Sequence, residues 1–216
     1  MSFLWIADSV AQEQVAPLGH NPFLEQAAVG QQGYARKTTA LTLPFFEDFT
    51  GYDVFPDPAR WTDRQVYVNN SMCVNPVSRG VATFDALNEH GIPYNTLNPF
   101  AAVYADSLTS QVIDLSGEVP ADSIYLSFFY QPQGNGFAPE AGDSLMLFFK
   151  KDDTSWVKVW SKEGSAVHPF TPVMIPVREA HFFHEHFQFR FVNIASINLN
   201  DDVWNLDYIR VSKYRT

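Results

Sequence analysis

The chain of 216 residues contains a single cysteine, Cys73, and this scarcity excludes several kinds of chemistry. One thiol cannot form an intramolecular disulfide, and it supports neither a thiolate metal cluster nor CxxC redox chemistry. Long apolar runs are also missing, since none approaches the roughly 18 residues that a membrane-spanning helix needs. We therefore expect no disulfide framework and no direct insertion into a membrane.

Positive charge is scarce as well, with 14 Lys and Arg against 24 Asp and Glu and a net charge of −10. Nucleic acids and anionic membranes select basic surfaces, so this balance excludes nucleic acid as a partner. Cations and neutral ligands are still compatible with it. Apolar residues, by contrast, make up 46% of the chain and aromatic residues 15%, which is enough for a sizeable core and excludes a disordered chain.

The first 40 residues have a different composition from the rest. Residues 12–40 are rich in Gln, Ala and Gly without a sustained period, which predicts a flexible arm or linker with one helical turn around Phe23–Ala28. The apolar run Phe3–Ala7, followed by the small residues Ser9 and Ala11, resembles the end of a signal peptide, although no basic segment precedes it. Residues 1–11 are therefore either a signal remnant or a chance match. We expect an arm over 1–40 and one domain over 41–216.

From Leu41 onward, short apolar and aromatic runs alternate with Gly, Pro, Asn and Asp, a pattern typical of many strands and turns. Residues 187–191 alternate Phe with Gln and Arg, which predicts a half-buried antiparallel strand. Segments 123–131 and 143–150 are apolar on both faces, as in central strands. Only 179–185 is a compact helix candidate, so the pattern predicts an all-β sandwich. Ten strands are predicted, over residues 41–49, 65–69, 80–85, 106–115, 123–131, 143–150, 156–161, 170–177, 187–193 and 203–212.

A few carboxylates lie inside these apolar strands. Glu47 and Asp48 belong to the first predicted strand, Asp207 to the last, and Asp85 to the third. A carboxylate between aromatic residues needs a partner or a cation, because leaving it desolvated and unpaired costs several kcal/mol. Since first and last strands of a sandwich are often neighbours, we expect Glu47, Asp48 and Asp207 to converge on a structural calcium ion, with Asp85 as a further candidate ligand. The alternative is that each accepts backbone N–H groups or pairs with an arginine such as Arg210.

Aromatic side chains are the candidates for ligand binding, because sugar rings stack on Trp and Tyr. Trp156 and Trp160 are expected on one side of the same strand with Lys158 between them, and Tyr94 is expected near a loop. Packing in the core is the alternative for the tryptophans, since the whole chain is rich in aromatic residues.

Catalytic motifs are missing. The sequence contains no paired-carboxylate spacing of the concanavalin-like glucanases, no GxSxG and no glycine-rich phosphate loop. Glu140 and Asp143 lie in a Gly- and Pro-containing segment, where a solvated turn is expected. We therefore expect no catalytic residue and no enzyme activity.

Taken together, segments over about 41–213 resemble the N-terminal jelly-roll module of Bacteroidota cell-surface proteins associated with type IX secretion and gliding motility. The order of elements is also similar to MAM domains and concanavalin-like sandwiches. The segments that carry the resemblance are Leu43–Phe49, Trp61–Asp63, Gly80–Asp85, Asp106–Ser110, Leu126–Gly134, Gly142–Leu145, Phe187–Phe191 and Trp204–Ile209.

This resemblance implies an antiparallel jelly-roll sandwich that acts as a non-catalytic binding or adhesion module for a glycan or a protein. It implies a structural calcium ion between the terminal strands at Glu47, Asp48 and Asp207, and a place outside the cell or at its surface, associated with the outer membrane. Such modules are usually followed by further repeats and a sorting domain, whereas this sequence ends at Thr216. Two alternatives stay open: a concanavalin-like glycoside-processing enzyme, and a structural component of a secretion or gliding assembly.

Overall fold

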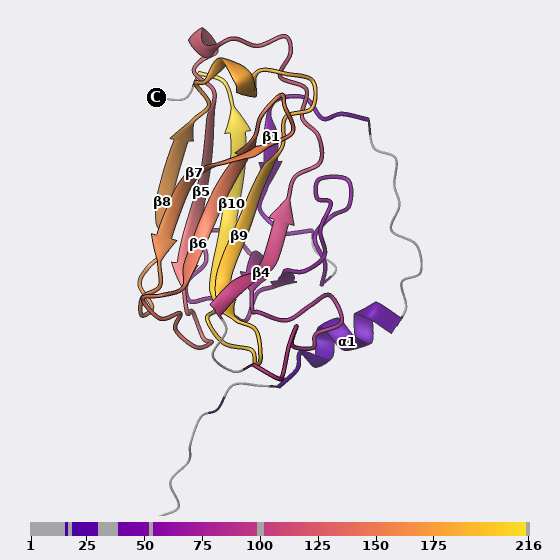
Figure 1. Ribbon diagram of the computed structural model, residues 1–216, viewed down its shortest axis with the longest axis vertical. Coiled ribbons are helices and arrows are strands. Elements are labelled where there is room, and N and C mark those ends of the chain that lie inside the picture. The colour runs from indigo at the N-terminus through magenta and orange to yellow at the C-terminus, as the bar shows by residue number, and fades with distance from the viewer. Residues whose placement is uncertain (1–15, 17–18, 30–38, 52–53, 99–101, 215–216) are drawn as a thin grey trace, which may run out of the picture.

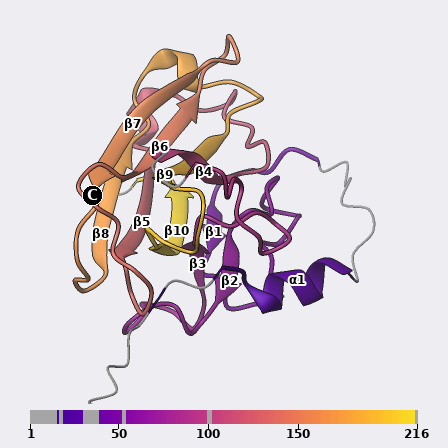
Figure 2. The same ribbon diagram turned by 60° about the horizontal axis from the view of Figure 1, so that its bottom comes forward.

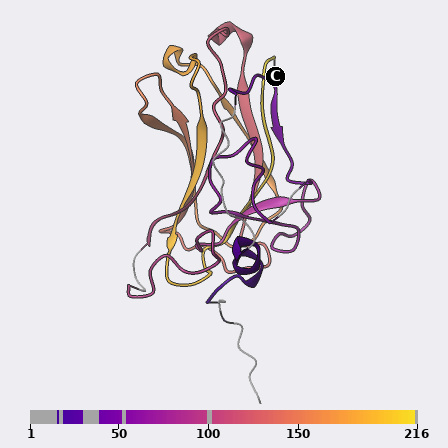
Figure 3. The ribbon, with the colours of Figure 1, turned by 90° about the vertical axis from the view of Figure 1, so that its right-hand side faces the viewer.

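The computed structural model describes residues 16, 19–29, 39–51, 54–98 and 102–214, which form two antiparallel sheets packed face to face (Figures 1 and 3). The possible signal remnant at 1–11 lies outside the described residues. The strands are β1 (Phe45–Glu47), β2 (Tyr67–Asn69), β3 (Val81–Phe84), β4 (Ala102–Thr109), β5 (Tyr125–Pro132), β6 (Ser144–Lys150), β7 (Trp156–Glu163), β8 (Thr171–Pro176), β9 (Phe189–Ser196) and β10 (Trp204–Ser212).

One sheet, called the β10 sheet here, has six strands in the order β2-β3-β10-β5-β8, with β1 also paired to β10. The other, called the β9 sheet, has four strands in the order β4-β9-β6-β7. The fold class predicted from the sequence, an antiparallel jelly-roll β-sandwich, is confirmed. The first and last strands are neighbours, as expected, because Phe45 to Glu47 pair antiparallel with Val211 to Ile209.

Each predicted strand overlaps an observed one, and the differences have local causes. The strand expected at 106–115 begins earlier, as β4, and after Thr109 the chain makes only isolated bridges from Ser110 and Ile113. The helix candidate at 179–185 holds a single 3-10 turn, η2 (Ala180–Phe182), and a second such turn, η1, covers Pro120–Asp122. Strands β5 and β6 lie inside their sheets, as their apolar faces predict.

The core lies between the sheets and is dominated by aromatic rings. Phe187, Phe189 and Phe191 are fully buried, whereas Gln188 and Arg190 are half-buried on the other face, so the predicted alternation is confirmed. Burial of apolar area of this kind is the main stabilising contribution to a sandwich. Because the inner faces are filled by side chains, any ligand has to bind to an outer face or to the loops.

Residues 19–29 are docked on the sandwich, and the expectation of a loose arm is wrong for them. Helix α1 (Pro22–Val29) is capped by Asn21, whose Oδ1 accepts the N–H groups of Phe23 and Leu24. Leu24 is fully buried against a small cluster that includes Tyr67 of β2, next to which α1 lies in Figure 2. The helical turn predicted around Phe23–Ala28 is confirmed, and the cap, the buried Leu24 and the partly buried Ala27 and Ala28 attach it to the sandwich.

The prediction that Trp156 and Trp160 share one side of β7 is also wrong. The pairing of β6 with β7 shifts register between Leu147 and Phe148, since Trp160 lies opposite Leu147 but Lys158 lies opposite Phe148. The extra residue in β7 is a bulge, which turns the preceding part of the strand over. Trp160 therefore packs inward on Phe128 and Tyr130, with ring centroids 5.1 and 5.3 Å apart, whereas Trp156 faces outward.

Candidate functional site

The outer face of the β9 sheet carries an open groove of about 420 Å³. Its lining comes from β4, β6 and β9 and from the segment before β2, so strands far apart in the sequence build it together. The lining combines aromatic rings with polar groups, the composition usual in small-ligand sites. The residues are Gln65, Tyr104, Ala105, Ser107, Phe148, Arg190 and Val192, and Trp156 of β7 extends the face beside them. We call this surface the outer aromatic face.

Arg190 holds the outer aromatic face together. Its guanidinium carbon lies 4.4 Å from the centroid of the Trp156 ring and 5.6 Å from that of Phe148, within the range of cation–π attraction. Its Nε atom is buried without a hydrogen-bond partner, and in the described part of the chain Arg190 forms no ion pair. A guanidinium with unused donors in an open groove is equipped to bind an oxygen-rich ligand.

The groove has polar side chains at fixed positions around these rings. Ser107 donates to Gln65 Oε1 at 2.7 Å, and the Ser107 backbone N–H donates to the same oxygen at 3.0 Å. At the far end, Lys150 Nζ donates to Gln188 Oε1 at 2.9 Å. Tyr104 is 65% exposed, so its ring is open to solvent at the rim.

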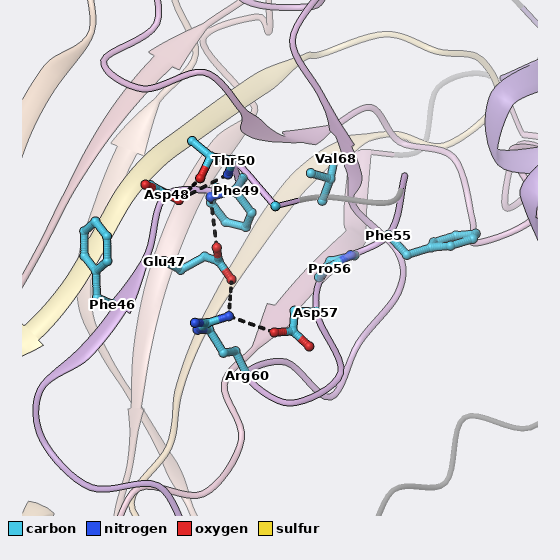
Figure 4. A pocket seen from close by; sticks show the side chains of 11 residues that line it. Phe46, Glu47, Asp48, Phe49, Thr50, Phe55, Pro56, Asp57, Arg60 and Val68 are labelled. Carbon is cyan, nitrogen blue, oxygen red and sulfur yellow. Dashed lines mark hydrogen bonds and ion pairs between the residues drawn. The ribbon is translucent and has the colours of Figure 1, made fainter.

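A second, polar cavity of about 240 Å³ surrounds Glu47 (Figure 4). Glu47 Oε1 accepts the Phe49 N–H at 2.9 Å and Oε2 accepts the Trp61 Nε1–H at 3.1 Å, with Arg60 Nη1 3.9 Å from Oε2. Burial raises the pKa of the Glu47 carboxyl, and these two hydrogen bonds lower it in part. Arg60 already supplies a positive charge at the Glu47 carboxylate, whereas no Lys or Arg in the described part of the chain forms an ion pair with Asp207. The contacts of Glu47 match the alternative stated above, in which the carboxylate accepts N–H groups and lies near an arginine.

Of the predicted site residues, Asp48 and Asp207 come closest to forming a site of oxygen ligands. Ser78, which was not predicted, lies between them. The Ser78 hydroxyl lies 2.7 Å from the Asp48 carbonyl oxygen, 3.2 Å from that of Gly80 and 2.7 Å from Asp207 Oδ1. Asp207 Oδ2 accepts the Ser78 N–H at 2.7 Å, and burial raises the pKa of Asp207 while the bonds from Ser78 lower it in part. Carbonyl and carboxylate oxygens gathered in this way fit the ligands that calcium prefers. The Asp48 carboxylate itself turns away to Thr50.

Asp85, the further metal candidate, belongs to a separate buried network and does not join Glu47, Asp48 and Asp207. Asp85 accepts from Asn21 and from the Leu87 N–H, and its immediate neighbour is the fully buried Asp106. Asp106 Oδ1 accepts the hydroxyl of Tyr94 at 2.8 Å. Tyr94, predicted to bind a ligand, thus uses its hydroxyl inside the protein. Trp160, predicted to do the same, is packed on the core, and only Trp156 of the three lies on the outer aromatic face.

The solvated turn expected for Glu140 and Asp143 is wrong for Asp143, which is 3% exposed. Asp143 lies beside Glu140 and Asp202, with one carboxylate oxygen from each residue within 4.8 Å of the others. Asp202 follows β9 in the loop to β10 and is fully buried. Sequence reasoning missed Asp202 and Arg190; the strict alternation at 187–191 placed Arg190 outward, but nothing in the sequence joined it to Trp156.

Comparison with known proteins gives distant similarities only. No family model matches the chain, and no curated protein matches it. Among solved structures, the chain is similar to the C-terminal family 22 carbohydrate-binding module from Clostridium thermocellum, with a TM-score of 0.45, 11% identity and coverage of 78% of this chain and 91% of that one. The chain is also similar to the cleaved adhesin domain of Lys-gingipain from Porphyromonas gingivalis, with a TM-score of 0.43 and 10% identity. This match covers 77% of this chain and 95% of the adhesin domain.

The CBM27-1 module of Caldicellulosiruptor saccharolyticus, solved with mannohexaose, gives a TM-score of 0.42 and 13% identity over 78% of this chain and 96% of that one. An arabinose-bound α-L-arabinofuranosidase matches with a TM-score of 0.43 and 11% identity. The match covers 77% of this chain but only 25% of the enzyme. At this level of similarity neither a ligand nor an activity can be transferred. Among the described residues, no helix is long and apolar enough to cross a membrane.

Proposed function

We propose that this chain is a non-catalytic binding module that holds a neutral oligosaccharide on its outer aromatic face. The observation that carries the proposal is the open groove lined by Arg190, whose guanidinium has no acidic partner among the described residues and lies over the ring of Trp156 beside the groove. Sugar rings stack on exposed aromatic side chains through their C–H faces, and the guanidinium donates hydrogen bonds to neighbouring hydroxyl groups. The net charge of −10 favours a neutral glycan over an anionic one.

The groove favours binding over catalysis. Glycoside hydrolysis uses two carboxyl groups on either side of the scissile bond. The residues that line the groove in the described part of the chain are aromatic, aliphatic, amide, hydroxyl and guanidinium groups, with no carboxylate among them. A sugar bound there would meet hydrogen-bond donors and ring faces but no acid and base pair.

Replacing Trp156 by alanine should abolish most of the affinity for the glycan. Removing a stacking ring costs about 2 kcal/mol of binding free energy, which is about a thirtyfold rise in Kd. A glycan array identifies the ligand, and isothermal titration calorimetry of the Trp156→Ala variant measures the loss. Arg190→Lys should also weaken binding, because it keeps the charge but removes the planar fork of donors.

The matched control for that experiment is Phe46→Ala. Phe46 is an exposed aromatic on the outer face of the β10 sheet, 38% exposed like its neighbour Tyr208. Its loss should leave glycan affinity unchanged. Glycan binding that survives Trp156→Ala, or that is lost in Phe46→Ala instead, contradicts the assignment to the outer aromatic face.

A second candidate function, docking of a protein in a secretion or motility assembly, is supported by the aromatic patch around Phe46. The ring of Tyr208 contacts Phe46 at 4.9 Å and Phe129 at 6.3 Å, edge to face, on the outside of the β10 sheet. Exposed apolar patches of this kind often contact other proteins. The same two variants separate the candidates, because Phe46→Ala would weaken docking without affecting a glycan. In either case we place the module outside the cell or at its surface, within a larger surface protein.

We also propose a structural calcium ion at Asp207 with the carbonyl oxygens of Asp48 and Gly80, between β1 and β10. Calcium that binds only the folded state increases the free energy of unfolding, by about 2.7 kcal/mol when the free calcium concentration is 100 times the Kd. The unfolding temperature rises accordingly. Calorimetric scans with calcium and with a chelator should differ, and the difference should shrink in Asp207→Asn. An identical calcium-dependent gain in the wild type and in Asp207→Asn would count against this site.

A further inference from the structure

The three carboxylates of Glu140, Asp143 and Asp202 lie where two loops cross between the sheets. The loop from β5 to β6 carries Glu140 and Asp143, and the loop from β9 to β10 carries Asp202. Strands β5 and β10 are neighbours in one sheet, and β6 and β9 are neighbours in the other, so both loops leave and enter adjacent strands. The loops also touch through backbone bonds, with the Val203 N–H donating to the Phe137 carbonyl at 3.1 Å.

The loop geometry fixes these carboxylates close together. Asp143 Oδ2 accepts the Glu140 N–H at 2.9 Å, which closes the turn in front of β6. A side chain at Gly164 would meet the Glu140 carbonyl oxygen at 1.9 Å, so the end of β7 presses directly against this turn. Asp202 Oδ2 accepts the Ser196 N–H at 2.7 Å, which sets the direction of its second oxygen.

That second oxygen, Asp202 Oδ1, is buried and has no hydrogen-bond partner, in a residue with no exposed surface. One carboxylate oxygen of Asp202 lies within 4.8 Å of one oxygen from Glu140 and one from Asp143. Buried polar atoms are nearly always satisfied, and an unsatisfied carboxylate oxygen is among the most costly. An oxygen of this kind, placed against two other carboxylates, needs either a shared proton or a bound cation.

Basic side chains do not supply a positive charge to the three carboxylates. In the described ranges, no Lys, Arg or His forms an ion pair with Glu140, Asp143 or Asp202. Asp201, next along the chain, adds a further carboxylate.

We propose that Glu140, Asp143 and Asp202 bind a calcium ion that joins the two crossing loops. All the donors are oxygens, and an irregular site built from loops suits the flexible coordination of calcium better than the strict octahedron of magnesium. This site is separate from the one at Asp207, because none of its carboxylates comes from β1 or β10. It does not depend on the glycan-binding proposal.

The test measures calcium stoichiometry and affinity by titration calorimetry on the full chain in its wild-type, Asp202→Asn and Asp207→Asn forms. In Asp202→Asn the amide oxygen can still accept the Ser196 N–H, and the amide N–H₂ can donate to the carboxylate of Glu140, so the variant is expected to fold. The wild type should bind calcium, and Asp202→Asn should lose one site or weaken it by at least about tenfold. Asp207→Asn should keep that site.

A second variant, Glu140→Gln, separates loss of calcium binding from loss of folding, because Glu140 is exposed and its replacement is not expected to disturb the fold. It should also weaken the site. In the absence of calcium, Asp202→Asn should unfold at a higher temperature than the wild type, because a repulsive charge is removed. A wild type that binds no calcium at millimolar concentration would overturn the proposal, as the carboxylates would then share protons. Equal calcium binding by wild type, Asp202→Asn and Glu140→Gln would overturn it too.

Discussion

Trp61→Ala should be among the most destabilising single substitutions in this protein. Trp61 is 1% exposed, and its ring contacts Phe45, Phe49 and Phe189 at centroid distances of 5.4, 6.0 and 5.7 Å. Truncating a buried aromatic residue to alanine costs about 3–5 kcal/mol. The substitution also removes the Nε1–H donor of the buried Glu47 carboxylate, which adds about 1–3 kcal/mol.

The total is comparable to the whole stability of an ordinary domain, about 5–15 kcal/mol. The unfolding temperature should therefore fall by roughly 10–20 °C, measured by thermal unfolding followed by circular dichroism. Trp61→Phe is the matched control, because it keeps an apolar ring in the core while it removes the donor to Glu47 and a smaller part of the side-chain volume. It should cost about 2 kcal/mol. If Trp61→Phe is as harmful as Trp61→Ala, the hydrogen bond and not the packing dominates, and the expected ranking is wrong.

The second large effect is a fall in stability as the pH rises from about 4 to 7. Asp85 and Asp106 are both fully buried and adjacent, and burial raises the pKa of Asp85 to about 7 and that of Asp106 well above its ordinary value. The charge of Asp85 contributes to the shift at Asp106. The remaining groups in contact are neutral, namely Asn21, Tyr94 and Asn193, and Glu89 adds a further negative charge near Tyr94.

A carboxyl with a raised pKa in the folded state binds a proton that the unfolded chain has already released. The folded state therefore holds more protons than the unfolded state between about pH 4 and 7, and the stabilisation is lost as the pH rises through this range. The unfolding temperature should be higher at pH 5 than at pH 7.5, by about 5 °C or more.

Asp106→Asn is the comparison that isolates the pair, since the other carboxyl groups titrate in both proteins. The variant removes one of two interacting charges and should flatten the dependence on pH. Scanning calorimetry at several pH values in wild type and variant gives the difference directly. A pH dependence that is equally steep in both proteins would show that the Asp85–Asp106 pair does not control it.

The parts of the fold that follow local patterns were predictable from the sequence. The alternation of Phe with Gln and Arg at 187–191 gives the orientation of β9, and the two-sided apolar runs give the inner positions of β5 and β6. The pairing of β1 with β10 follows from a general tendency of sandwiches and is confirmed. Each of these properties depends on residues within one strand or on a common rule of topology.

The candidate sites depend on contacts between distant segments, and there prediction failed. The bulge in β7 separates Trp156 from Trp160, although nothing in Trp156–Trp160 breaks the alternation. Glu47 finds its cation in Arg60 and not in Arg210, because the loop before Trp61 folds back over β1. Asp202 meets Asp143 only because two loops cross at the same end of the sandwich.

The central position of β10 also affects how the chain can fold during synthesis. This strand, nearest the C-terminus of those described, pairs with β1, β3 and β5, which lie about 80 to 160 residues earlier. A nascent chain cannot complete the β10 sheet until β10 itself has left the ribosome, so β1 and β3 stay unpaired on their β10 side until then. Contacts so distant in sequence fold slowly and leave aggregation-prone edges in the meantime.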